Sequence, residues 1–158
     1  MTSELFSPAH GGHVLHLGED ERGLLSRLLG ELREVVTDDD AGAMARRLFP
    51  VVHPDHPDRE AEYQRLMREE LVASHLGALA SVDEVLLRPG RTVTLDDAEM
   101  ASFVQAVNSL RLVLGTALDV TEDDDIEQPG RRASSQFQLY AYLSWVLDSA
   151  IRELSGEQ

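Results

Sequence analysis

The sequence predicts a mainly α-helical fold, a bundle of about five helices with a small antiparallel β element, organised as a single domain over residues 1–158. Three observations predict it. Apolar residues recur at helical spacing over most of the chain. Two short alternating segments bounded by turn residues are typical of strands. A length of 158 residues lies in the single-domain range and allows a sizeable core.

The β element is expected from the N-terminal segment and from residues near 92–95. Val14–Leu17 follows turn-rich residues 7–12, which include one proline and two glycines, so this segment predicts a small hairpin. Thr92–Leu95 follows a break at residues 88–91 and has the composition of a short strand that could pair with it.

The helices are placed by apolar stripes and by their start and stop signals. Acidic residues in the first turn favour a helix start at residue 19. Asp96, with Glu99 three residues later, resembles a capping box at the start of another helix. Helices are predicted over residues 19–36, 41–49, 59–87 (as pieces 59–74 and 80–87), 96–118 and 134–154.

The last predicted helix is apolar over more than half of its circumference. Such a helix is either central in the fold or half of an oligomer interface. We therefore expect a homodimer.

Composition excludes several classes of function. The net charge is −15, with 29 acidic residues against 14 arginines and no lysine, and this counts against a broad nucleic-acid footprint. No apolar run reaches the roughly 18 residues of a membrane helix, and the N-terminus lacks the basic start of a signal peptide. We expect a cytoplasmic protein with no membrane contact. The absence of cysteine excludes thiol chemistry.

Catalytic motifs are not apparent. The sequence contains no nucleophile elbow, phosphate-binding loop or dinucleotide fingerprint. We predict that the protein is not an enzyme and needs no cofactor.

Arg111 is the main candidate site residue. It lies in the middle of an apolar stripe of the fourth main helix, and a core-facing arginine requires a carboxylate or several carbonyls. Glu21 and Asp148 are the candidate partners, because each lies on or beside the apolar side of its helix. The prediction is an ion pair that is structural or that binds a partner; a ligand pocket is the alternative.

The histidines form two H-x-x-H patterns, at His10, His13 and His16 and at His53 and His56. Metal binding would need three or four ligands converging on one point. Because both patterns fall on turns or loops, where this spacing does not place side chains on one face, we predict no metal site.

Three stretches carry a family resemblance: Arg47-Leu48-Phe49-Pro50, residues 107–115 with Asn108, Leu110, Arg111 and Gly115, and residues 139–143 with Tyr140. Together they resemble an actinobacterial family long known as a domain of unknown function. Its genes typically lie near the gene for the N-end-rule adaptor of the Clp protease, and its members include the actinomycete oxidative stress regulator.

The resemblance implies a helical and dimeric protein that controls transcription in stress responses through contact with a sigma factor or RNA polymerase. This sequence departs from the family pattern at Phe103, Tyr142 and Ser109, and it lacks the cysteine pair associated with redox control. If it regulates oxidative stress genes, it does not sense oxidant with its own thiols.

The functional prediction is therefore a non-enzymatic regulator of transcription in stress responses that acts through protein contacts. Two alternatives remain. One is direct DNA binding through a local arginine patch of a dimer, which would weaken steeply with salt. The other is a metal- or small-molecule-binding protein that uses the histidines or Arg111.

Overall fold

The N-terminal segment forms a hairpin that a third strand completes. The structure is a computed structural model in which residues 4–38, 48, 51–117 and 135–156 are described. Its antiparallel sheet has the order β1-β2-β3, with bounds Phe6–Ala9, Gly12–His16 and Thr92–Leu95. Leu15 pairs with Phe6 on one side and with Val93 on the other. The predicted β element is thus confirmed, although its turn is shorter than expected and the strand predicted over Val14–Leu17 covers Gly12–His16.

Glycine is required at the hairpin turn. Gly11 has a φ of 81°, a conformation that L side chains rarely adopt. A Cβ on Gly12 would lie 2.3 Å from the carbonyl oxygen of Leu95, so only glycine lets β3 approach so closely here.

Four helices are present among the described residues, where about five were predicted. They are α1 (Glu19–Thr37), α3 (Pro57–Leu87), α4 (Asp97–Ala117) and α7 (Ser135–Ser155). The helix predicted over 41–49 falls outside the described residues except for Leu48. None of these four helices has a stretch long and apolar enough to cross a membrane.

The two pieces predicted over residues 59–87 are one continuous helix, α3. Gly77 is the only glycine inside it, and an interior glycine costs only about 1 kcal/mol. Leu76 and Leu79 on either side of it pack into or against the core. The apolar stripe therefore continues through the point where the break was expected.

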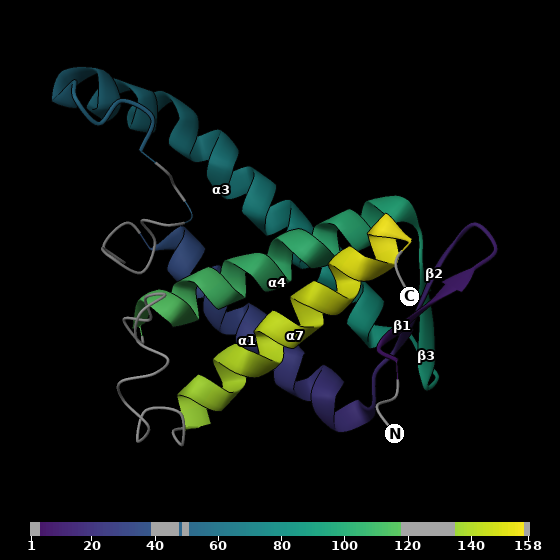
Figure 1. The fold of residues 1–158 in the computed structure, drawn as a ribbon. Coiled ribbons are helices and arrows are strands. Elements are labelled where there is room, and N and C mark those ends of the chain that lie inside the picture. The colour runs from purple at the N-terminus through teal and green to yellow at the C-terminus, as the bar shows by residue number, and fades with distance from the viewer. Residues whose placement is uncertain (1–3, 39–47, 49–50, 118–134, 157–158) are drawn as a thin grey trace.

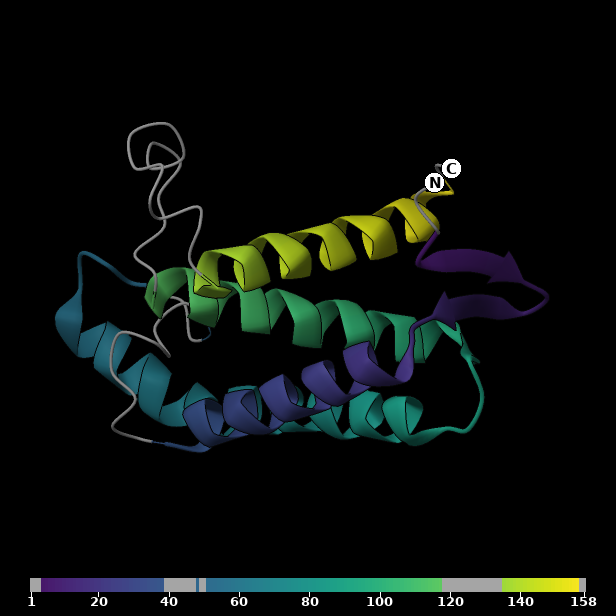
Figure 2. The ribbon, with the colours of Figure 1, turned by 90° about the horizontal axis from the view of Figure 1, so that it is seen from below.

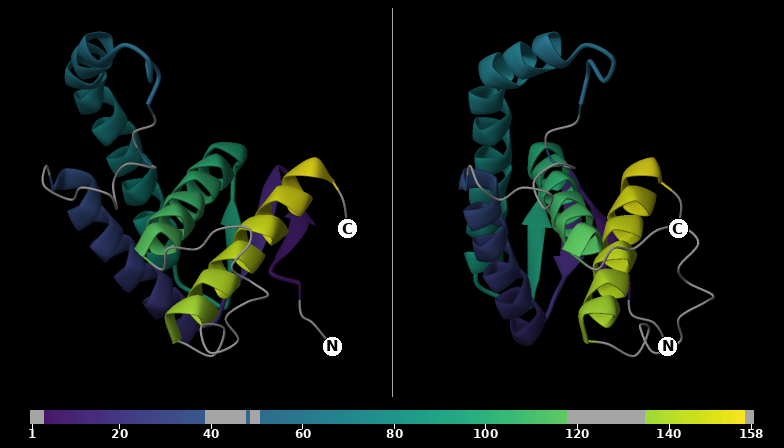
Figure 3. Two further views of the ribbon diagram at one scale, coloured as in Figure 1. Left: turned by 60° about the vertical axis from the view of Figure 1, so that its left-hand side comes forward. Right: turned by 90° about the vertical axis from the view of Figure 1, so that its left-hand side faces the viewer.

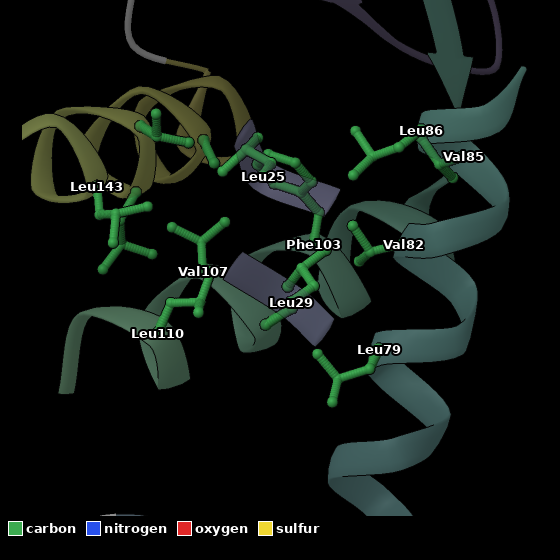
Figure 4. Close-up of a cluster of buried hydrophobic side chains, with 14 of the residues drawn as sticks. Leu25, Leu29, Leu79, Val82, Val85, Leu86, Phe103, Val107, Leu110 and Leu143 are labelled. Carbon is green, nitrogen blue, oxygen red and sulfur yellow. The ribbon is translucent and has the colours of Figure 1, made fainter. Parts of the chain in front are cut away.

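α4 forms the middle layer of the molecule (Figure 2). α7 covers one side of it, and α1 and α3 lie on the other. The largest buried side chain of α4, Phe103, stacks edge-on against Phe6 of β1 at 5.5 Å between ring centroids. Figure 4 shows Phe103 and Val107 of α4 among leucines and valines of α1, α3 and α7.

The N-terminal part of α3 projects beyond the other helices (Figures 1 and 3). All fully buried side chains of α3 lie between Ala78 and Leu86. Leu71, Val72 and Leu76 pack partly against the core, and no earlier residue of α3 does so. We call Pro57–Glu70 the α3 arm. At 1.5 Å per residue it is roughly 20 Å long.

Arginines fasten the helices together at the sheet end of the bundle. Arg22 donates to the carbonyl oxygens of Leu17 at 3.0 Å and Arg88 at 2.8 Å. Arg88 itself donates to the carbonyl of Thr94 at 2.9 Å and contacts the carboxylate of Glu99. The Arg88 guanidinium holds the pKa of Glu99 below its usual range, so this bridge is charged at neutral pH.

The capping box predicted for α4 is confirmed. The backbone N–H of Glu99 donates to Asp96 Oδ1 at 2.7 Å, and the backbone N–H of Asp96 donates to Glu99 Oε1 at 3.0 Å. Two N–H groups that the helix cannot pair internally are therefore satisfied.

Replacing Asp96 with Ala removes one half of this capping box. We expect the free energy of unfolding to fall by about 1 kcal/mol, the usual cost of losing a capping side chain. Urea denaturation followed by circular dichroism measures the change. Asp55→Ala, an exposed acidic residue of the loop before α3, is the matched control and should change stability by less than about 0.5 kcal/mol. Equal effects of the two substitutions would contradict the assignment.

Candidate functional site

Arg111 is partly buried and lies on the same side of α4 as Gly115, whose neighbour is Tyr140 of α7. Its Nη2 donates to Asn108 Oδ1 at 3.5 Å, which is a long hydrogen bond, and its Nε is buried with no partner among the described residues. Within the described parts of the chain, this weak bond stabilises the fold little, because desolvation of the guanidinium offsets what the bond contributes.

The predicted ion pair of Arg111 is not formed with either candidate carboxylate. Glu21 accepts a hydrogen bond from the hydroxyl of Tyr142 at 3.2 Å. Asp148 pairs with Arg152 on the same helix at 3.1 Å. For Glu21, the reason is that it lies at a different height along the bundle from Arg111. α1 and α4 both begin at the sheet end, with Glu21 in the first turn of α1, whereas Arg111 lies roughly 20 Å along α4.

The resemblance residues of the second and third stretches meet where α4 packs against α7. Asn108, Arg111 and Gly115 share one side of α4, and a Cβ on Gly115 would lie 3.0 Å from Cε2 of Tyr140. Leu110 points into the core instead and is 7% exposed. The absence of a side chain at Gly115 thus allows α4 and α7 to lie close together. Of the first stretch, Arg47, Phe49 and Pro50 lie outside the described residues, and Leu48 is buried in the core.

An aromatic pair borders the outer side of α7. The rings of Tyr142 and Trp145 lie 6.0 Å apart, and Trp145 is 44% exposed. Burial, aided by the charge of Glu21, raises the pKa of the Tyr142 hydroxyl far above its ordinary value, so this group stays a hydrogen-bond donor at neutral pH. Helical periodicity does not identify Trp145 as a surface residue, because the pattern alone cannot distinguish an exposed tryptophan from a buried one.

The N-terminal histidines do not converge. His13 bridges two carboxylates, with Nδ1 3.1 Å from Glu153 of α7 and Nε2 3.1 Å from Asp97 of α4. His16 instead lies 2.7 Å from the hydroxyl of Ser7. Within the described parts of the chain, no group of three or more potential ligands is placed to hold a metal ion.

The His13 bridge could not be predicted from the sequence, because Glu153 is 140 residues away and only the fold brings it near. The Glu153 side chain is 7% exposed and that of Asp97 is 91% exposed. The hydrogen bond to Glu153, more than that to Asp97, raises the pKa of His13. The bridge is therefore strongest when the imidazole is protonated and both ring nitrogens donate.

Exposed apolar side chains gather around the α3 arm. Leu66 on the arm is 64% exposed, and Val51 and Val52 before it are 62% and 48% exposed. Glu60 ties this segment to the arm, because its Oε1 accepts hydrogen bonds from the backbone of Val52 at 2.8 Å and His53 at 2.7 Å.

These features define an acidic helical protein with a three-stranded sheet at one end and a projecting helical arm at the other. The chain belongs to the protein family described as Domain of unknown function (DUF2017), which matches residues 1–154. No curated protein and no solved structure matches the chain. The predicted membership of a family of unknown function is thus confirmed.

Substituting Gly115 with Ala tests the α4–α7 contact. Alanine at an open helical glycine stabilises a helix by about 0.5–1 kcal/mol, and we expect this gain for Gly30→Ala and Gly77→Ala, where nothing lies within 4 Å of the added Cβ. Gly115→Ala should be less stable than these controls by about 1 kcal/mol or more, because the methyl group crowds Tyr140. Thermal unfolding of the three variants gives the comparison. An equal gain at all three positions would show that the helices are not closely packed there.

Replacing His13 with Gln tests the bridge through its pH dependence. The pKa of His13 is raised in the folded state. The bridge therefore contributes its full stabilisation below the unfolded pKa of about 6.5, and this stabilisation is lost as the pH rises through the folded pKa of His13. The variant should be less stable than the parent by about 1 kcal/mol at pH 5.5, and the difference should shrink toward pH 9. Urea denaturation across this range measures it. A difference that grows with pH would contradict the bridge.

Proposed function

We propose that the protein is a non-enzymatic regulator of transcription in stress responses that acts in the cytoplasm through contact with a protein partner, a sigma factor or RNA polymerase. The regulatory part rests on the resemblance to the actinomycete oxidative stress regulator. The contact part rests on one observation, the projecting α3 arm with its exposed Leu66.

The arm supports a binding role because it contributes little to the core. An isolated helix of its length is only marginally stable in water. No arm residue is fully buried among the described contacts, so the arm would gain stability from a surface that covers Leu66. Burial of a leucine in an interface contributes about 1.5–3 kcal/mol.

Charge favours a protein partner over duplex DNA. With a net charge of −15, the chain repels a polyanion. The adjacent arginine pairs of the sequence, residues 46–47 and 131–132, lie outside the described residues. A DNA-binding role through an arginine patch therefore has no specific observation in its favour.

The homodimer remains part of the proposal. The apolar residues of α7 differ in burial. Leu143, Val146, Leu147 and Ala150 are buried in the core of the chain itself. Ile151 and Leu154 are 50% and 46% exposed and are what α7 would offer to a second copy.

Replacing Leu66 with Asp tests the arm as a contact surface. Tagged protein is incubated with nuclease-treated lysate of its native host, and the bound proteins are identified by mass spectrometry. We expect a sigma factor or RNA polymerase subunits with the parent protein and at least about a tenfold loss with Leu66→Asp.

Leu87→Asp is the matched control, because Leu87 also lies on α3, is 82% exposed and stands at the opposite end of the helix. It should leave the capture unchanged. Capture of the same polymerase subunits by Leu66→Asp and parent alike would reject the arm as the contact surface. Capture of no transcription protein by the parent would reject the function.

A further inference from the structure

A cavity lies between α1, α4 and α7, at the end of the bundle away from the sheet. Its volume is about 220 Å³. Buried leucine and valine side chains from all three helices line it: Leu32, Leu110, Val113 and Leu143. Four partly buried leucines and valines of the same helices complete its walls. α1 and α7 cross in different layers (Figures 1 and 2), and the cavity lies between the C-terminal half of α1 and the N-terminal half of α7.

Size and lining favour an apolar occupant. An apolar cavity of about 150 Å³ is enough to bind a molecule the size of benzene. The cavity is open to solvent on one side, and the eight leucine and valine side chains of its wall offer no hydrogen bonds to the water in it. An apolar group that enters therefore removes hydrocarbon surface from water at little cost in lost hydrogen bonds.

Two polar side chains complete the lining. Glu31 of α1 and Gln136 of α7 are both exposed and both border the cavity, so they lie at its rim. Among the described residues, Glu31 is the only charged one in the lining. A carboxylate at the rim of an apolar cavity attracts a cationic head group, and the net charge of −15 adds to this preference.

We propose that this cavity binds a small amphiphile with a hydrocarbon body and a primary amine head. The body occupies the space among Leu32, Leu110, Val113 and Leu143, and the ammonium group lies beside the carboxylate of Glu31. The site is distinct from the α3 arm and does not depend on the function proposed for it.

The proposal is tested with three eight-carbon probes that differ only in the head group: n-octylamine, n-octanol and n-octanoate. Each is titrated into the full chain at 0.15 M salt and neutral pH, and binding is followed by amide chemical shifts in ¹⁵N spectra. We expect octylamine to bind at least about fivefold more tightly than octanoate, with octanol between them. The shifts should be largest around the cavity and absent from the β sheet.

Glu31→Gln should weaken octylamine about threefold and leave octanol unchanged, because it removes only the charge. Glu34→Gln is the matched control, since Glu34 is an exposed carboxylate of the same helix that does not line the cavity. It should change neither affinity. Val35→Phe, which fills the cavity from its wall, should abolish binding of all three probes.

Three results would overturn the proposal. The first is no saturable binding of any probe to the parent protein. The second is tighter binding of octanoate than of octylamine. The third is equal octylamine affinity of the parent and Glu31→Gln. If Val35→Phe does not fold, the comparison of Glu31→Gln with Glu34→Gln still decides, because both substitutions lie on the exposed surface of α1.

Discussion

The packing of α4 against its neighbours is the constraint on which the rest of the structure depends. Its side chains Met100, Phe103 and Val107 are almost completely buried. α7 lies on one side of it and α1 and α3 on the other, and the sheet meets its first turns. The capping box at Asp96 and Glu99 sets where α4 begins, and Arg88 joins that point to the end of α3. A change that shifted α4 along its axis would disturb every other interface.

This arrangement also determines what is left for binding. Since only the part of α3 from Leu71 onward packs against the core, the earlier turns of α3 project as an arm on which Leu66 is exposed. Since α1 and α7 cross each other on different sides of α4 instead of lying parallel, they leave an apolar cavity with Glu31 at its rim. Both candidate binding features are thus consequences of how helices are placed around one central helix.

Local features were predictable from the sequence, and long-range ones were not. The capping box, the hairpin with its third strand and the last helix (134–154 predicted, Ser135–Ser155 found) follow from short-range signals. Arg111 shows the limit. Helical periodicity predicted that Arg111 faces the core, but Arg111 is only partly buried, whereas Ser109 of the same helix is 4% exposed. The axial offset between helices, which separates Arg111 from Glu21, also depends on tertiary packing. The cavity and the bridge from His13 to Glu153 arise in the same way from residues far apart in the chain.

The central claim is that α4 carries the stability of the bundle while the α3 arm is a weakly supported extension available to a partner. Hydrogen exchange of the free protein, read peptide by peptide by mass spectrometry, tests it most directly. The account predicts the slowest exchange in α4 between Met100 and Val113, and exchange in the α3 arm that is faster by at least about a hundredfold. Protection of the arm equal to that of α4 would contradict it, because the arm would then be part of the stable core.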